Sequence, residues 1–149
     1  MIFDSAHFLL VPTRWLGQGT IDLNMVQETL SFATKWTISS LNEMNQIVAL
    51  QEIEIRHFPD KIVNEFVFFD ITSSDFKVLM DSPSLGRAEA KGFLREGEIG
   101  WEFSKQNGDF EGFEYYKKTA SDVYEMKAHY KNDGLHTHIK GKIWLPLKK

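Results

Sequence analysis

The sequence contains no cysteine among its 149 residues, and this absence removes several kinds of chemistry at once. Without thiols the chain forms no disulfide, holds no zinc or iron–sulfur cluster through cysteine, and has no thiol nucleophile. Long hydrophobic runs are also missing, since the longest apolar segments, Phe8–Val11 and Phe66–Phe69, are too short to cross a bilayer. Residues 1–12 lack the basic start of a signal peptide and carry Asp4, so we expect a cytoplasmic protein.

An excess of one charge is absent as well. The chain has 17 basic and 21 acidic residues and a formal net charge of −4, whereas proteins that bind nucleic acid or anionic membranes show a basic excess. We therefore expect no nucleic-acid partner and no membrane partner. Gly-rich phosphate loops, Gly-x-Ser-x-Gly elbows and His-Glu-x-x-His helices are missing too, so no motif identifies a catalytic residue.

Aromatic residues, by contrast, are abundant. The 12 Phe, 4 Trp and 4 Tyr exceed what a disordered chain would carry, and the length suits one domain with a real core. Many of these rings alternate with polar residues, as where Ile99, Trp101 and Phe103 alternate with Glu102 and Ser104. A period of two predicts antiparallel strands with one buried face and one solvated face.

Turn signals recur about every ten to fifteen residues and divide the chain into strands. We expect about ten, near residues 14–23, 27–40, 46–57, 62–71, 74–80, 85–95, 98–106, 109–119, 122–132 and 135–146. A flat sheet this wide would expose its edges, so the prediction is an all-β fold in which a single antiparallel meander closes into a barrel. The barrel domain would span residues 1–149, with residues 1–12 as an N-terminal strap or short helix.

Two hairpins can be registered from their turns, at residues 96–97 and 107–108. Both registers set Trp101 and Phe103 among very small residues, with the Glu114 carboxyl nearby. The predicted inward set consists of Ala88, Ala90, Gly92, Trp101, Phe103, Gly112, Glu114 and Tyr116.

This inward set has two interpretations, a filled core and the wall of a ligand cavity. Barrels of eight or more strands often enclose a ligand-sized interior, and a wet pocket would accommodate the Glu114 carboxylate without a partner. On the cavity interpretation the chain is a non-enzymatic binding protein for a small, mainly hydrophobic molecule. The predicted ligand residues are Trp15, Trp36, Ala88, Ala90, Gly92, Trp101, Phe103, Glu114 and Tyr116.

Two other functions stay open. Glu114 is the candidate general acid or base if the barrel is an enzyme, which requires a raised pKa and a second titratable group within hydrogen-bond reach. A filled core would instead indicate a structural or interaction protein. In that case the segment Val63–Ile71, with apolar residues on both faces, is the candidate contact of a homodimer.

Three histidines form the candidate metal site. A two-residue turn at Asp133-Gly134 sets His129 opposite His138 and brings His136 to the same face. Three imidazoles in reach of one another bind divalent metals, but the alternation places this face outside the barrel beside several lysines. We therefore expect no metal site and an exposed histidine cluster.

Three short motifs carry a family resemblance: Trp15-Leu16-Gly17-Gln18-Gly19, Gly92-Phe93-Leu94-Arg95 and His136-Thr137-His138-Ile139. The chain resembles calycin-type barrels, particularly the nitrobindin-like and fatty-acid-binding-protein-like families. The resemblance implies a lipocalin-like barrel, and in a nitrobindin-like protein His138 would be the proximal haem ligand. The alternation of the last strand places His138 on the polar face, which conflicts with that role.

Overall fold

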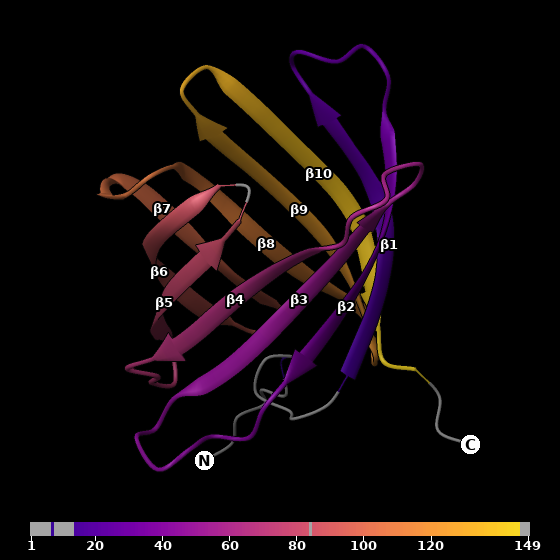
Figure 1. Cartoon of the computed structure of the whole chain (residues 1–149). Coiled ribbons are helices and arrows are strands. Elements are labelled where there is room, and N and C mark those ends of the chain that lie inside the picture. Colours follow the sequence, from indigo (N-terminus) through magenta and orange to yellow (C-terminus); the bar gives the residue numbers. More distant parts are fainter. Residues whose placement is uncertain (1–6, 8–13, 84, 147–149) are drawn as a thin grey trace.

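In a computed structural model, the described part of the chain forms ten antiparallel strands that close into a barrel (Figure 1). The structure describes residues 7, 14–83 and 85–146. The strands are β1 (Arg14–Leu23), β2 (Leu30–Ile38), β3 (Ile47–Ile55), β4 (Ile62–Phe69), β5 (Asp75–Ser82), β6 (Gly86–Arg95), β7 (Glu98–Gly108), β8 (Glu111–Ala120), β9 (Val123–Asn132) and β10 (Leu135–Trp144). Each strand pairs with its neighbours in sequence, and β1 pairs with β10 to complete the ring. The predicted all-β meander barrel is confirmed.

The hairpin registers are confirmed in most positions. Trp101 lies opposite Gly92 on β6 and Glu114 on β8, and Phe103 lies opposite Ala90. Gly108 differs from the prediction, because it belongs to β7 and pairs with β6 rather than forming the turn to β8. The register between β6 and β7 shifts just before that point, and this irregularity carries the β7 strand past the expected turn.

The turn between β9 and β10 has the geometry that its sequence predicts. Asp133 and Gly134 both have positive φ values, 48° and 84°, as a type I′ turn requires. This turn fixes the pairing of His138 with His129 and of Ile139 with Ala128. The last hairpin therefore presents its histidines to the outer face and Ile139 to the interior.

One end of the barrel is filled with aromatic rings, and we call it the aromatic end. It carries the turns β2–β3, β4–β5, β6–β7 and β8–β9. Its rings belong to Trp15, Trp36, Phe66, Phe68, Phe76, Trp101, Tyr116 and Tyr124, all of them buried. The ring centroids of Trp36 and Phe66 are 5.0 Å apart, and those of Trp101 and Phe68 are 5.4 Å apart. Such tilted and edge-to-face pairs are the usual arrangement of aromatic rings in a close-packed core.

His7 joins this end from outside the strands. Its Nε2 atom donates to the carbonyl oxygen of Arg95 at 2.7 Å, and its Nδ1 atom lies 3.0 Å from the Tyr124 hydroxyl. The predicted strap or short helix over residues 1–12 otherwise lies outside the described residues. His7 itself is in neither a helix nor a strand.

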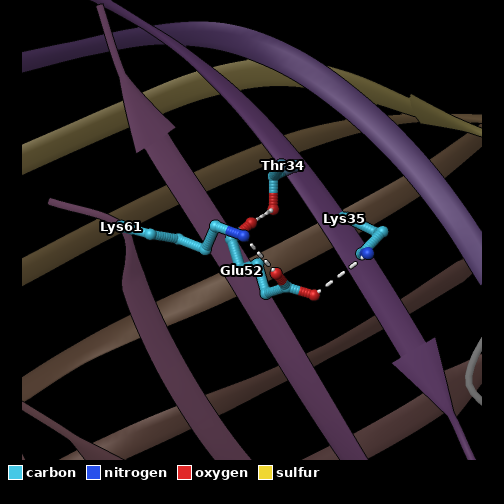
Figure 2. A network of polar contacts seen from close by, with 4 residues as sticks. All are labelled: Thr34, Lys35, Glu52 and Lys61. Atoms are coloured by element: carbon cyan, nitrogen blue, oxygen red, sulfur yellow. Dashed lines mark hydrogen bonds and ion pairs between the residues drawn. The ribbon is translucent and has the colours of Figure 1, made fainter. Parts of the chain in front are cut away.

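The outer face of the barrel is solvated and carries small ion-pair networks. Figure 2 shows one of them, in which Glu52 on β3 contacts Lys61 at 2.9 Å and Lys35 at 3.3 Å. The hydrogen bond from Lys61 holds the pKa of the Glu52 carboxyl below its usual value. In the same view, the Thr34 hydroxyl donates to the backbone carbonyl of Glu52 at 2.8 Å. Exposed pairs of this kind add little stability but keep this face polar.

Strand β4 is apolar on both faces, as its sequence indicates. Phe66 and Phe68 point into the core and are buried, whereas Val67 and Phe69 are half-buried on the outside. A homodimer through Val63–Ile71 stays a prediction. Among the described residues, no helix has the length and apolarity needed to cross a membrane. The cytoplasmic location likewise stays a prediction.

Candidate functional site

A cavity of about 250 Å³ occupies the end of the barrel opposite the aromatic end. We call this the cavity end; it carries the turns β1–β2, β3–β4, β5–β6, β7–β8 and β9–β10. The apolar lining consists of Ile21, Leu23, Leu30, Phe32, Ile53, Ile55, Ile62, Met80, Leu85, Met126, Leu135 and Ile139. The polar lining consists of Gln51, Asn64, Glu114, Tyr130 and Thr137. Strand alternation brings these side chains inward, and branched aliphatic residues supply most of the wall.

Glu114 supplies a carboxyl group to the cavity. It lies on β8, is 1% exposed, and accepts a hydrogen bond from the Tyr116 hydroxyl at its Oε1 atom, 2.5 Å away. The Tyr130 hydroxyl donates to the other carboxyl oxygen, Oε2. Burial raises the pKa of the Glu114 carboxyl to about 7, although both tyrosine hydrogen bonds act in the opposite direction. Near neutral pH the carboxyl is therefore divided between its neutral and charged forms.

The two tyrosines remain hydrogen-bond donors throughout the physiological range. Burial, together with the neighbouring Glu114 charge, raises the pKa of Tyr116 and that of Tyr130 well above the usual value. Neither hydroxyl compensates the charge of the carboxylate. Among the described lining residues there is no lysine, arginine or histidine, so an ionised Glu114 has no cationic partner in the cavity.

A second polar group faces the cavity from β3 and β4. Gln51 and Asn64 lie opposite each other in the register, and both are buried, at 4% and 5% exposure. The Asn64 Nδ2 atom donates to Gln51 Oε1 at 3.1 Å. The buried Asn64 Oδ1 atom has no hydrogen-bond partner among the described residues. An unpaired buried acceptor is costly, which makes this atom a candidate contact for a ligand.

Of the predicted ligand residues, Glu114 alone lines the cavity in the described part of the chain. Tyr116 lies one step deeper, where it bonds Glu114 and packs against Trp101 with centroids 5.6 Å apart. Trp15 and Trp36 belong to the aromatic end, and Phe103 packs against Phe110. Ala88 and Ala90 are buried outside the cavity lining.

Gly92 shows why the small residues open no space here. A Cβ atom added at Gly92 would lie 2.2 Å from the ring of Phe76, which is its cross-strand neighbour on β5. The volume beside Gly92 is thus occupied by an aromatic ring from the next strand. The inward registers are confirmed, but the room next to Trp101 is filled.

The sequence reasoning missed the cavity end, including Gln51, Asn64 and Tyr130. A signal for two of them exists in the alternation. Gln51 falls in phase with the inward Ile53, and Asn64 in phase with the inward Phe66. A polar residue at an inward strand position needs a partner or a ligand. The alternation alone would therefore have identified Gln51 and Asn64 as candidate site residues.

The three histidines form a stack on the outer face of β9 and β10. The ring centroids of His129 and His138 are 4.2 Å apart, and His129 Nε2 lies 3.1 Å from His136 Nδ1. Burial, followed by the charges of the other two imidazoles, lowers the pKa of His129. Within the described residues no cluster of three ligand side chains is arranged for a metal. His138 is exposed and points away from the cavity, so its position gives no support to a role as haem ligand inside the barrel.

Comparisons with known proteins find a solved structure with a similar fold, but no match by sequence. No family model matches the chain, and no curated protein matches it. The solved structure of the S-type phycobiliprotein lyase CPES from Guillardia theta superimposes with a TM-score of 0.67. It is 10% identical and the match covers 92% of this chain and 89% of the lyase. At that identity the likeness shows the fold alone, a closed antiparallel β-barrel.

Proposed function

We propose that this protein binds one small, mainly apolar molecule in the cavity end of the barrel and does not transform it. The observation that carries the proposal is the cavity of about 250 Å³, walled by aliphatic side chains and furnished with a few buried polar groups. This is the composition of small-molecule sites in general, whose volumes run from about 300 to 1,000 Å³. The ligand is therefore small, or it inserts only one end.

The polar groups support a site rather than a packing defect. A defect in a core costs stability and has no reason to include a carboxyl group, because burying one without a charge partner is expensive. Glu114 and Asn64 both lie at this cavity, and both are buried. Since a phycobiliprotein lyase has the same barrel, the fold alone decides neither the ligand nor a reaction.

Calorimetric titration with 1-hexanol tests the proposal. We expect saturable binding of one molecule per chain in the native protein. Ile53→Phe, which places a ring in the cavity, should abolish that binding, because Ile53 lines the cavity. Val63→Phe is the matched control, since Val63 lies on the outer face at 38% exposure, and it should bind hexanol normally. Binding that survives Ile53→Phe would refute the proposed site.

One observation favours a second candidate function, proton transfer by Glu114. A buried carboxyl with a pKa of about 7, held by two tyrosines at a cavity, has the properties of a general acid or base. The probe is 5-nitrobenzisoxazole, whose ring opens when a base removes its carbon-bound proton. An enzyme would open it at a rate that rises as the pH passes about 7 and that Glu114→Gln abolishes. A rate equal to that of buffer excludes this function for the probe's reaction class.

A further inference from the structure

We propose that the ligand is a small apolar amine whose ammonium group lies between the Glu114 carboxylate and the Asn64 side-chain oxygen. The inference rests on the proposed function and names the chemistry of its ligand. It starts from one property of the cavity: two of its buried acceptors, the Glu114 carboxylate and Asn64 Oδ1, have hydrogen-bonding capacity left over.

Glu114 has unused acceptor capacity. An ionised carboxylate offers about four lone-pair sites, and the Tyr116 and Tyr130 hydroxyls occupy one on each oxygen. The described cavity lining contains no basic side chain, so no described side chain of the lining compensates the negative charge. A cationic ligand group would provide the missing partner, in surroundings where charge-assisted hydrogen bonds are strong.

Asn64 presents the second acceptor. Its amide nitrogen is engaged by Gln51, which leaves Oδ1 as the atom without a partner. An ammonium group carries three N–H donors and no acceptor, so its chemistry matches a lining that presents these two acceptors. The aliphatic wall from β1, β2, β3 and β10 would then enclose the alkyl part.

Other ligand classes match this lining less well. A carboxylic acid would bring a second negative charge into a cavity without a described cation, and such an arrangement is repulsive. An alcohol offers one donor and no charge, so it would satisfy one acceptor only. The expected order of affinity is therefore amine, then alcohol, then carboxylate.

Three probes with the same alkyl chain test this order by calorimetry at pH 8: hexylamine, 1-hexanol and hexanoate. Charge-assisted hydrogen bonds contribute about twice as much as neutral ones, so hexylamine should bind about tenfold more tightly than hexanol. Glu114→Gln should remove that preference while hexanol still binds. Glu125→Gln, the same change on the exposed outer face of β9, should leave it intact.

Asn64→Leu provides a second variant in case Glu114→Gln does not fold. This substitution should lower the affinity for hexylamine severalfold, because it removes an acceptor. It should leave the affinity for hexanol nearly unchanged, because it keeps the apolar wall. In the native protein, the affinity for hexylamine should rise about tenfold from pH 6 to pH 8 as Glu114 ionises. Tyr116 and Tyr130, the titratable groups facing Glu114, stay protonated over this range.

The outcomes separate the two proposals. If hexanol binds and hexylamine binds no better, or if hexanoate binds best, the inference of an amine ligand is refuted and the proposed function stands. If none of the three binds saturably, the proposed function itself fails. If hexylamine binds best but Glu114→Gln keeps the preference, the ammonium does not lie at this carboxyl and the inference is refuted.

Discussion

The two ends of the barrel share strands, topology and alternation, yet buried aromatic rings pack one end and the other holds a cavity. At the aromatic end, large rings reach across the barrel axis and contact one another, as Trp36 and Trp101 do with centroids 6.4 Å apart. At the cavity end, isoleucine and leucine occupy most equivalent inward positions. These side chains are shorter than the rings of the aromatic end, and the cavity lies between them. Side-chain length, rather than strand topology, decides where space remains.

Glu114 lies at the boundary between the two ends. Tyr116, which packs into the aromatic end, donates to one carboxyl oxygen, and Tyr130, which lines the cavity, donates to the other. The aromatic end thus holds the Glu114 carboxyl in place, while the cavity end presents it to a ligand. Rigid support behind a polar group is what a binding site requires for selectivity.

The largest expected difference between the ends is in the cost of removing a ring. Phe66→Ala, at a fully buried position of the aromatic end, should lower the free energy of unfolding by about 3–5 kcal/mol. Phe32→Ala should cost at least about 1 kcal/mol less, because one side of the Phe32 ring already faces the cavity and has fewer contacts to lose. Urea unfolding of both variants measures the difference. Equal costs would show that the cavity is closed in solution.

The next effect is a pH dependence of stability that comes from Glu114, at the boundary between the two ends. The pKa of Glu114 is about 7 in the folded protein against an ordinary 4.5, so the folded state holds its proton more tightly. The tighter binding of this proton stabilises the folded protein in full below pH 4.5. This stabilisation is lost as the pH rises toward 7, by about 3 kcal/mol in total. Relative to the native protein, Glu114→Gln should therefore gain about that much stability between pH 4.5 and pH 8. Unfolding curves across this range give the difference, and a flat difference would mean that folding does not raise the pKa of Glu114.

A smaller effect comes from adding atoms instead of removing them. Gly92→Ala should destabilise the fold by about 1–3 kcal/mol, because the new methyl group meets the Phe76 ring within a packed cluster. Ile53→Phe adds more atoms, but places them at the cavity, and should change stability by less than about 1 kcal/mol. Thermal unfolding compares the two variants. A tolerated Gly92→Ala would restore the idea of space beside Trp101.

The contrast between the ends also explains what could be predicted from the sequence. Strand positions and hairpin pairings follow from alternation and two-residue turns, so the opposition of Trp101 to Gly92 was predictable. Whether Gly92 borders empty space depends on Phe76, which reaches it from a third strand. The turn signal between β5 and β6, Asp81-Ser82-Pro83, is not a two-residue type that fixes a register. The sequence therefore predicted no position for the Phe76 ring, which pairs with Gly92 in the structure.

The cavity end was missed for a related reason. Its wall consists of ordinary inward aliphatic residues, which in a sequence are indistinguishable from a filled core. Only the closure of β1 on β10 brings Ile21 and Ile139 together, and closure depends on the whole sheet. Glu114 was identified because a carboxyl at an inward position is unusual wherever it occurs. Its partner Tyr130 was missed, because it comes from the adjacent strand β9 and no registered turn related that strand to Glu114.

The smallest effect is expected at the aromatic end, where His7 is attached. His7→Ala removes the contacts with the Arg95 carbonyl and the Tyr124 hydroxyl and should lower stability by about 1–2 kcal/mol. Because these contacts lie across the barrel from the cavity, the affinity for 1-hexanol should not change. Urea unfolding and hexanol titration of one sample measure both quantities. Weaker hexanol binding in this variant would show that the two ends are coupled, and the division between a supporting end and a binding end would then no longer hold.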